Sequence, residues 1–280
     1  MLQHDVRRHD TRGGPAVTST ISTISTISTM SRSTPWQLID EMPLRFDAHH
    51  PQGMARVGSL WWISTVDIEA RQGYVLGVDG DGQLVDRIPV GDRDRHHPGG
   101  MDFDGDALWI AAAEYRPDSS ATIYRLQPGE RPTRAFDVGD HVGAIARCGR
   151  DGDLVGWSWG SRRFYRWSVE GALLASRENP AFFVDHQDCQ WLGDGQLLCT
   201  GVAEVELASG LGWLGGIGLL DTSALTMTRE VPFPIYSPET GRVATHNPTW
   251  VEARPNDLVI HVLPDDAKGV LRSYSTRLAA

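Results

Sequence analysis

Cysteine, lysine and long apolar runs are all scarce in this sequence of 280 residues. The three cysteines, Cys148, Cys189 and Cys199, show neither the C-x-x-C spacing of a zinc ribbon nor the density of a disulfide framework. No segment has the ~20 consecutive apolar residues of a membrane span, and the N-terminus lacks the apolar core of a signal peptide. We therefore expect a cytoplasmic protein that has no disulfide framework and no membrane partner.

Positive charge is also limited, because Lys268 is the single lysine and the formal net charge is −10. An acidic surface repels phosphate backbones, which argues against nucleic acid as a partner. Sustained helical periodicity is absent, whereas glycine (30) and tryptophan (10) are abundant. This composition favours an all-β fold with many turns. Nothing in it indicates an oligomeric state.

The first part of the chain differs from the rest. Residues 18–29 repeat Ser-Thr-Ile three times, a low-complexity pattern that cannot build a core. We expect residues 1–34 to be a disordered extension, with Met30 as an alternative start of translation. Residues 35–280 are then left as a single domain.

That domain is built from an internal repeat. In each unit a histidine precedes a short apolar strand, a tight turn rich in Gly, Asp or Asn, and a second strand. The five histidines are His50, His97, His141, His186 and His246. They are spaced by roughly 45 to 60 residues, the size of one four-stranded propeller blade.

The later strands of each unit support this interpretation. The second strands open on a leucine, at Leu60, Leu108, Leu154, Leu197 and Leu258. Third strands follow in every unit, but the fifth unit ends before a fourth strand. Residues 36–44 can supply that strand and so close the ring and cover its open sheet edges. The sequence therefore predicts a five-bladed β-propeller of four-stranded blades, with an N-terminal strand completing the last blade.

The blade pattern resembles that of the lactonase- and lyase-type propeller superfamily, whose members have six or seven blades. The best local match runs from His97-Pro98-Gly99-Gly100-Met101 through Leu108-Trp109-Ile110. The resemblance spans residues 36–278 and implies architecture alone, because propellers carry unrelated activities.

The first strand of each propeller blade lines the central channel, so the five histidines are expected to form a ring at its mouth. Imidazole suits Fe, Cu, Zn or Mn better than Ca or Mg, and three or four rings can bind one such ion while a position stays open for substrate. Asp185 and Asp188 are expected to orient the imidazoles through hydrogen bonds. Two alternatives stay open: a ring that binds a polar ligand, and histidines that only bond neighbouring backbone.

Long predicted loops, including residues 114–120 and 203–212, emerge on the same face as the histidines. Carboxylates and a histidine at or near the ends of second strands are candidate general acids or bases. These candidates are Glu114, Glu204 and His261, and the residues expected to line the pocket are Asp67, Tyr115 and Trp159.

Two motif matches are set aside. Residues 156–160 fit the G-x-S-x-G nucleophile elbow, but that elbow needs a strand–turn–helix context, and here it falls within or just after a β-strand. The Asp-rich residues 102–106 lack the spaced ligands of an EF-hand and are typical of a turn.

These patterns predict a metal-dependent enzyme, an oxidoreductase or oxygenase, or else a lyase or isomerase, acting on a small organic molecule. The cofactor would be a divalent transition metal (Fe, Cu, Zn or Mn). The alternative function is a non-enzymatic propeller that binds a small molecule or a glycan.

Overall fold

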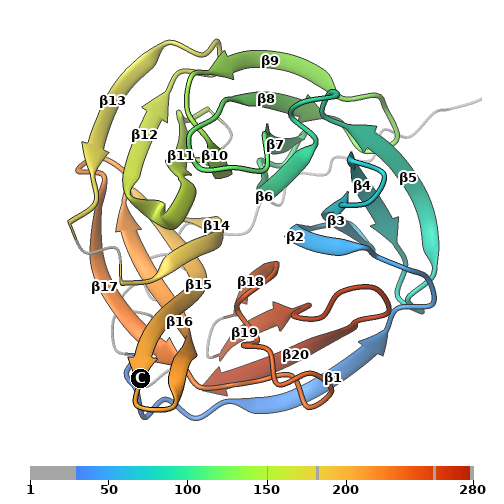
Figure 1. The fold of residues 1–280 in the computed structure, drawn as a ribbon, viewed down its shortest axis with the longest axis vertical. Helices are drawn as coiled ribbons and strands as arrows, with labels where there is room; N and C mark the ends of the chain where they lie inside the picture. The colour runs from blue at the N-terminus through green and yellow to red at the C-terminus, as the bar shows by residue number, and fades with distance from the viewer. Residues whose placement is uncertain (1–29, 150, 181–182, 255–256, 278–280) are drawn as a thin grey trace, which may run out of the picture.

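A computed structural model describes residues 30–149, 151–180, 183–254 and 257–277. The described chain is all-β, with 20 strands, one short 3-10 turn (η1, Trp159–Ser161) and no α-helix. Figure 1 shows the sheets standing radially around a central axis, with the inner strand of each sheet nearest the centre, as in a β-propeller. Within these residues no helix is long and apolar enough to cross a membrane.

The strands form four sheets, in which neighbours are antiparallel except for one parallel pair in the largest sheet. One sheet consists of β2 (His50–Val57), β3 (Leu60–Asp67), β4 (Gln72–Val78) and β5 (Leu84–Val90). Another consists of β14 (Asp185–Gly193), β15 (Gln196–Leu207), β16 (Gly210–Asp221) and β17 (Thr226–Phe233). A third consists of β18 (Thr249–Ala253), β19 (Asp257–Val262), β20 (Val270–Arg277) and β1 (Gln37–Pro43). The predicted second, third and fourth strands are thereby confirmed in these sheets.

The remaining sheet has eight strands. Four of them are β6 (His97–Phe103), β7 (Leu108–Ala113), β8 (Ala121–Leu126) and β9 (Thr133–Val138). The other four are β10 (Val142–Arg147), β11 (Leu154–Ser158), β12 (Arg163–Trp167) and β13 (Leu173–Glu178). The two halves meet through one parallel pair, Gly100 with Ala144, on the inner strands β6 and β10.

The predicted closure of the ring by an N-terminal strand is confirmed. Strand β1 pairs antiparallel with β20, from Gln37 opposite Ser275 to Pro43 opposite Val270. Met30, which lies in the predicted extension, is only 4% exposed and packs against the core beneath β16 and β17. Residues 31–34 of that extension are also described and include a hydrogen bond of 3.1 Å from the Thr34 N–H to the Ser31 carbonyl, whereas residues 1–29 lie outside the described residues.

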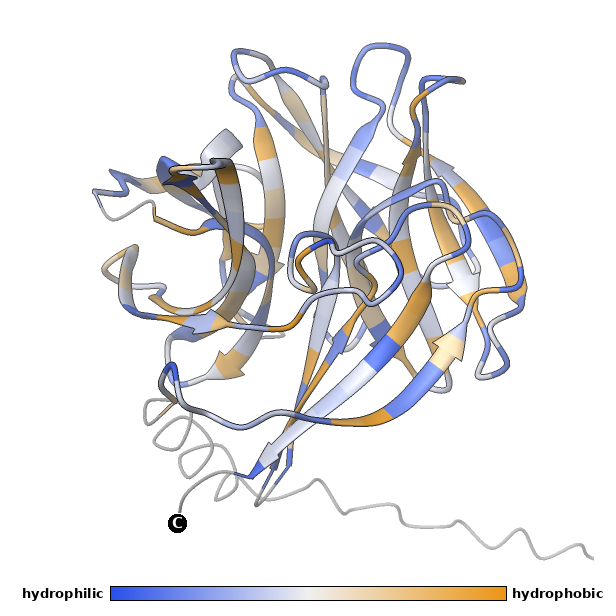
Figure 2. Cartoon of the chain, turned by 60° about the horizontal axis from the view of Figure 1, so that its bottom comes forward, coloured by the Kyte–Doolittle hydropathy of each residue, from blue (hydrophilic) through white to orange (hydrophobic). Residues whose placement is uncertain are grey.

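Apolar clusters fill the spaces between neighbouring sheets. Trp62 and Val75 of one sheet, for example, pack against Met101 and Leu108 of the next. Figure 2 shows the same division, with apolar residues mainly on strands and hydrophilic residues mainly in the connecting loops. Successive side chains of a strand point to opposite faces of its sheet, so each sheet packs against a neighbouring sheet on both faces.

Glycine is required where the inner strands approach the axis. A Cβ added to Gly99 would lie 1.7 Å from the carbonyl oxygen of Gly143, and one added to Gly100 would lie 2.3 Å from that of Gln187. Since both obstacles are backbone atoms, no rotamer change relieves them. Gly99 and Gly100 thus allow the inner strand β6 to lie close to β10 and β14.

The predicted loop over residues 203–212 is instead a β-hairpin, so that expectation was wrong. Strands β15 and β16 continue past the rest of their sheet and pair as far as Leu207 with Gly210. A two-residue turn, Ala208–Ser209, joins them, and Gly210 has a φ of 121° that favours glycine.

The sequence predicts no disulfide framework, but one disulfide is present. Cys189 and Cys199 are direct partners across β14 and β15, with Cα atoms 4.0 Å apart, and they form a disulfide. The sequence gives no spacing motif for this pair, because the contact arises from strand register. Cys148 stays free and half-buried.

We predict that the denatured, unreduced protein exposes one titratable thiol and that reduction exposes three. Burial raises the pKa of the Cys148 thiol to about 12, so the native protein should react slowly with thiol reagents. Titration with a chromogenic thiol reagent checks this, and Cys148→Ser should reduce the unreduced count to zero. Three thiols in air-purified, unreduced protein would contradict the pairing and would favour the reducing compartment expected from the sequence.

A layer of buried polar side chains ties the inner strands together across sheets. The Asp188 carboxylate on β14 accepts a hydrogen bond of 2.9 Å from the backbone N–H of Met54 on β2. The Gln190 amide accepts from the N–H of Val251 (2.6 Å), and the Asp102 carboxylate accepts from the N–H of Arg147 (3.1 Å). The first two bonds join inner strands of different sheets, and the third joins the two halves of the eight-stranded sheet.

Two of these groups make stability depend on pH. Burial raises the pKa of Asp102 to about 7 and that of Asp188 well above its usual value. Between about pH 4 and pH 7 the unfolded chain ionises Asp102 while the folded chain keeps the proton, so this contribution to stability falls as pH rises.

We predict that Asp102→Asn removes this part of the pH dependence, because the Asn oxygen still accepts from Arg147. The difference in unfolding free energy between wild type and variant should change by several kcal/mol between pH 4 and 7, as measured by urea denaturation. Asp81→Asn, at an exposed turn, is the control and should show a constant difference. A pH-independent difference for Asp102→Asn would refute the raised pKa.

Candidate functional site

A cavity of about 200 Å³ lies on the axis at the end where the inner strands begin, and all five repeat histidines border it. His50 and His97 are the first residues of β2 and β6, and His186 is the second residue of β14. His141 and His246 lie in the segments just before β10 and β18. The aromatic residues predicted to line the pocket, Tyr115 and Trp159, border it too. The five imidazoles nonetheless have different partners.

His50 is held by a carboxylate. Its Nδ1 lies 2.8 Å from Asp266 Oδ1, and Arg242 binds both carboxylate oxygens of Asp266 at 2.8 and 3.0 Å. Burial alone would raise the pKa of Asp266, but the hydrogen bonds from His50 and Arg242 lower it well below its usual range. An ionised Asp266 only accepts, so the Nδ1 of His50 donates to it and Nε2 is the ring nitrogen left to meet a ligand.

His141 is oriented in the same way by backbone. Its Nδ1 lies 3.0 Å from the carbonyl oxygen of Glu114 and 3.1 Å from that of Arg116. Carbonyls only accept, so Nδ1 donates and Nε2 is left as the acceptor or ligand atom. Burial lowers the pKa of His141, although these two bonds oppose the shift, so the ring is neutral at pH 7.

His97 has no hydrogen-bond partner at either ring nitrogen among the described residues, although it is only 6% exposed. Its ring centroid lies 4.3 Å from that of Tyr115 and 6.1 Å from that of His141. Burial lowers its pKa well below the usual value, and the neighbouring His141 and His50 lower it further. A buried, neutral and unpartnered imidazole has the properties of a group that meets a ligand.

The other two imidazoles also border the cavity but make further contacts outside it. His186 Nε2 lies 3.4 Å from Glu230 Oε1 on the outer strand β17, and its side chain is fully buried. Its Cε1 lies only 2.9 Å from the position a Cβ on Gly218 would take, which places the ring over β16. His246 packs against Trp213, with ring centroids 5.8 Å apart. In this arrangement no three His, Cys, Asp or Glu side chains of the described residues could hold a metal ion.

The predicted acid–base residues do not gather at the cavity. The Glu114 carboxylate is occupied by Arg116 and Ser120, and its pKa is lowered chiefly by the bond from Arg116. Glu114 contributes its carbonyl to His141 instead. Glu204 is exposed on the projecting part of β15. His261 packs between Trp61 and Trp250 (centroids 4.7 and 5.5 Å), and burial lowers its pKa to about 4.

The three predicted aspartates lie in three different places. Asp185 borders the central cavity and accepts from Ser161 Oγ at 3.0 Å, so it orients the chain beside His186 rather than an imidazole. Asp188 lies in the polar layer described above. Asp67 lines a separate open cavity of about 460 Å³ together with His49 and Asp266.

Sequence reasoning missed Asp266 and Arg242, which fix His50. They lie 216 and 192 positions away from it, so no local pattern links them. One signal was present: Asp266 follows the end of β19, in a connection that leads to the face where the histidines begin.

Comparisons with known proteins bear on the fold and the family. A family model described as a family of unknown function (DUF6454) matches residues 13–278. A search of curated proteins found no similar sequence. A hypothetical protein from Leishmania major has a TM-score of 0.54 at 13% identity, covering 84% of this chain and 90% of that one.

The tail fiber of Staphylococcus aureus phage P68 has a TM-score of 0.53 at 9% identity, and 93% of this chain spans 56% of it. A streptogramin B lyase, a propeller-type fold, is also similar, with a TM-score of 0.47, 13% identity and 90% of each chain covered. At such identities the likeness is one of fold, so function must be argued from the site.

Proposed function

This chain belongs to the family of unknown function DUF6454. From the residues of its central cavity, we propose that it is a metal-dependent enzyme that acts on a small organic molecule. His50, His97 and His141 would hold a divalent transition metal (Fe, Cu, Zn or Mn), leaving open positions toward the cavity. Such an ion supplies Lewis acidity or, if Fe or Cu, redox chemistry. Oxidoreductase or oxygenase and lyase or isomerase reactions both fit this description.

One observation carries the proposal: His97 is buried with both ring nitrogens unpartnered and its ring centroid is 6.1 Å from that of His141, while the Nδ1 atoms of His50 and His141 are already engaged. Metal-binding histidines usually donate their second ring nitrogen to a carboxylate or a carbonyl, as His50 and His141 do here. The lowered pKa values of His97 and His141 keep both rings neutral, as metal binding requires. Because the three rings do not yet converge, binding requires side-chain rotation within the cavity.

Metal titration of the protein purified without a histidine tag tests the proposal. We expect calorimetry with Zn²⁺, Mn²⁺, Fe²⁺ and Cu²⁺ to show one ion per chain for at least one metal. Circular dichroism before and after chelation is the control for folding. Folded protein that binds none of the four metals would overturn the proposal.

A second candidate function is the binding of a small molecule or a glycan without a metal. The divergent imidazoles favour it, since no three donors of the described residues converge, and Tyr115 and Trp159 offer aromatic surface. Ligand binding that is unchanged by a chelator would favour this function over the first.

We also propose that the fold is a β-propeller of five blades. Supporting this, β6–β9 and β10–β13 each make a four-stranded unit, and only the Gly100–Ala144 pair joins them. With the other three sheets this gives five units of equal strand number. A crystal structure in which β6 and β10 pair along their whole length would contradict the count.

A further inference from the structure

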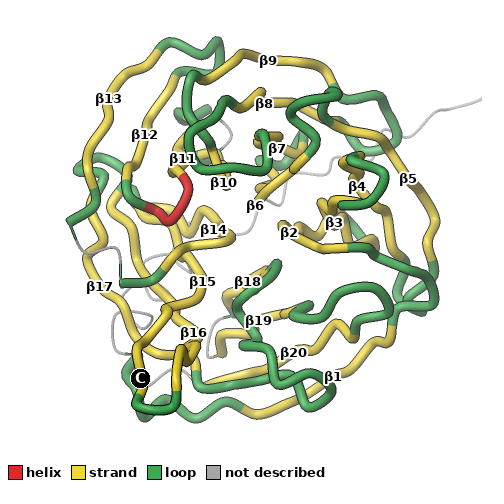
Figure 3. The backbone as a smooth tube through the Cα atoms, viewed as in Figure 1, coloured by secondary structure: helices red, strands yellow, loops and turns green. Residues whose placement is uncertain are grey.

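A further cavity, different from the one that Asp67 lines, lies next to the central cavity, and the two have lining residues in common. This side cavity has a volume of about 450 Å³, and both cavities are bordered by Ser158 and Trp159. Figure 3 places the 3-10 turn that begins at Trp159 beside β14, near the central opening. Ser158 and Trp159 therefore lie between the two cavities.

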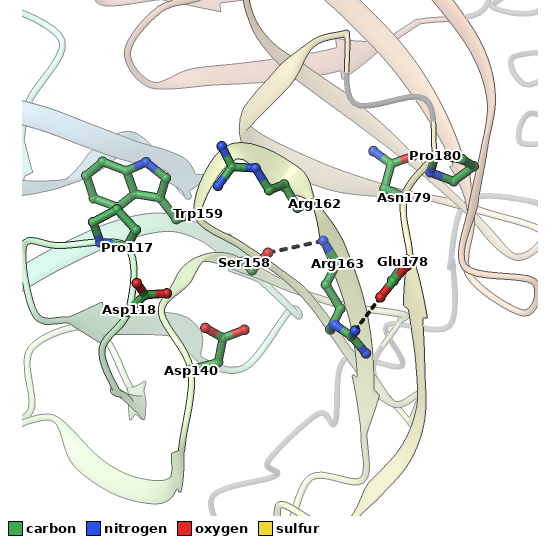
Figure 4. A pocket seen from close by; sticks show the side chains of 10 residues that line it. All are labelled: Pro117, Asp118, Asp140, Ser158, Trp159, Arg162, Arg163, Glu178, Asn179 and Pro180. Carbon is green, nitrogen blue, oxygen red and sulfur yellow. Dashed lines mark hydrogen bonds and ion pairs between the residues drawn. The ribbon is translucent and has the colours of Figure 1, made fainter.

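Two adjacent arginines line the side cavity, and they differ in whether their guanidinium groups are paired (Figure 4). Arg163 donates to Glu178 at 2.9 Å, whereas the Arg162 guanidinium has no hydrogen bond or ion pair among the described residues. Its Cζ lies 3.6 Å from the position a Cβ on Gly160 would take, and Gly160 borders the central cavity. Arg162 is thus an unengaged planar cation at the rim between the two cavities.

The turn that presents Arg162 and Trp159 is held rigidly. Ser161 has a φ of 52°, a left-handed conformation uncommon for a residue other than glycine, and it is fully buried. Its Oγ donates to Asp185 and accepts from the N–H of His186 at 2.7 Å, and its carbonyl accepts from Asn179 at 2.9 Å. A strained backbone fixed by several bonds is typical of a functional site.

The charges around the side cavity limit what Arg162 can bind. Asp118, Asp140 and Glu178 also line it. Asp140 accepts from the Tyr165 hydroxyl and the His141 N–H, and Glu178 is paired with Arg163. The carboxylates repel anions, so a phosphate dianion is disfavoured more strongly than a planar anion of charge −1 that can pair with the Arg162 guanidinium.

Two aromatic rings, those of Trp159 and Tyr115, lie next to the imidazoles of the central cavity. The ring centroid of Trp159 lies 4.8 Å from that of His141, and Tyr115 lies 6.2 Å from Trp159 and 4.3 Å from His97. We propose that the substrate is an aromatic monocarboxylate whose carboxylate binds Arg162 and whose ring packs on Trp159 and Tyr115, facing the imidazoles. The term substrate rests on the proposed function, but the binding mode does not require the metal.

Calorimetry with benzoate, 4-hydroxybenzoate and phenylacetate, each against its own amide, tests this inference. At least one carboxylate is expected to bind about tenfold or more tightly than its amide, since the amide cannot pair with a guanidinium in the same way. Arg162→Gln should abolish that preference. Arg163→Gln, the matched control at the neighbouring but engaged arginine, should keep it, and Trp159→Ala should weaken acid and amide alike.

The inference is overturned if no carboxylate is preferred to its amide, or if folded Arg162→Gln retains the preference. The same calorimetry, repeated with a chelator and with added Zn²⁺, tests the carboxylate preference independently of metal binding. A preference that depends on Arg162 in both conditions supports the inference even if no metal binds. Metal binding without any such preference overturns the inference and leaves the metal site standing.

Discussion

Replacing Gly99 with alanine is expected to destabilise the protein by about 3 kcal/mol or more, or to prevent folding. The new Cβ would overlap the carbonyl of Gly143, which belongs to the neighbouring inner strand. Relief would require the inner strands to separate, with the loss of the Gly100–Ala144 pairing beside them. In thermal denaturation the midpoint should fall by roughly 6–12 °C.

Gly80→Ala is the matched control for this prediction. Gly80 lies in a turn between β4 and β5, and a Cβ there would have no atom within 4 Å. Its midpoint should stay close to that of the wild type. Equal midpoints for the two variants would show that the inner strands do not approach the axis as closely as described.

Replacing His97 with alanine is expected to lower metal affinity by at least about 100-fold, because it removes a ligand and not merely an outer hydrogen bond. Asp266→Asn should cost less, about 10- to 100-fold, since it only loosens the orientation of His50. Competition calorimetry with a chelator of known affinity gives both values.

His49→Asn is the control for these variants. His49 precedes His50, but its ring contacts Arg87 and Tyr74 instead of the central cavity, and asparagine tolerates its φ of 56°. Metal affinity should not change. A loss in His49→Asn equal to that in His97→Ala would mean that the ion is bound elsewhere on the protein.

The parts of the fold that sequence predicts well are those decided by local chemistry. Gly and Asp turns, leucines that open the second strands and the β1 strand at the other end of the chain each leave a mark within a few residues. The 203–212 hairpin was read as a loop because its exposed strands lack the apolar continuity of a buried blade. The Cys189–Cys199 disulfide was missed because it follows from strand register, which depends on the whole sheet.

The site is predicted less completely, for a similar reason. The five repeat histidines border one cavity, but the repeat does not determine where each ring points. His186 lies over β16, where Gly218 leaves room for its ring, and its Nε2 is 3.4 Å from Glu230 Oε1. His50 is fixed by Asp266, a partner on the far side of the sequence. Side-chain direction here depends on contacts between units that the repeat itself does not encode.

The most direct test of the metal site is anomalous X-ray diffraction from crystals of the untagged protein soaked in Zn²⁺ or Mn²⁺. We predict one strong anomalous peak in the central cavity, about 2.1 Å from the Nε2 atoms of His50, His97 and His141. A peak beside His186 and Glu230, or none in the cavity while the protein stays folded, would contradict the account.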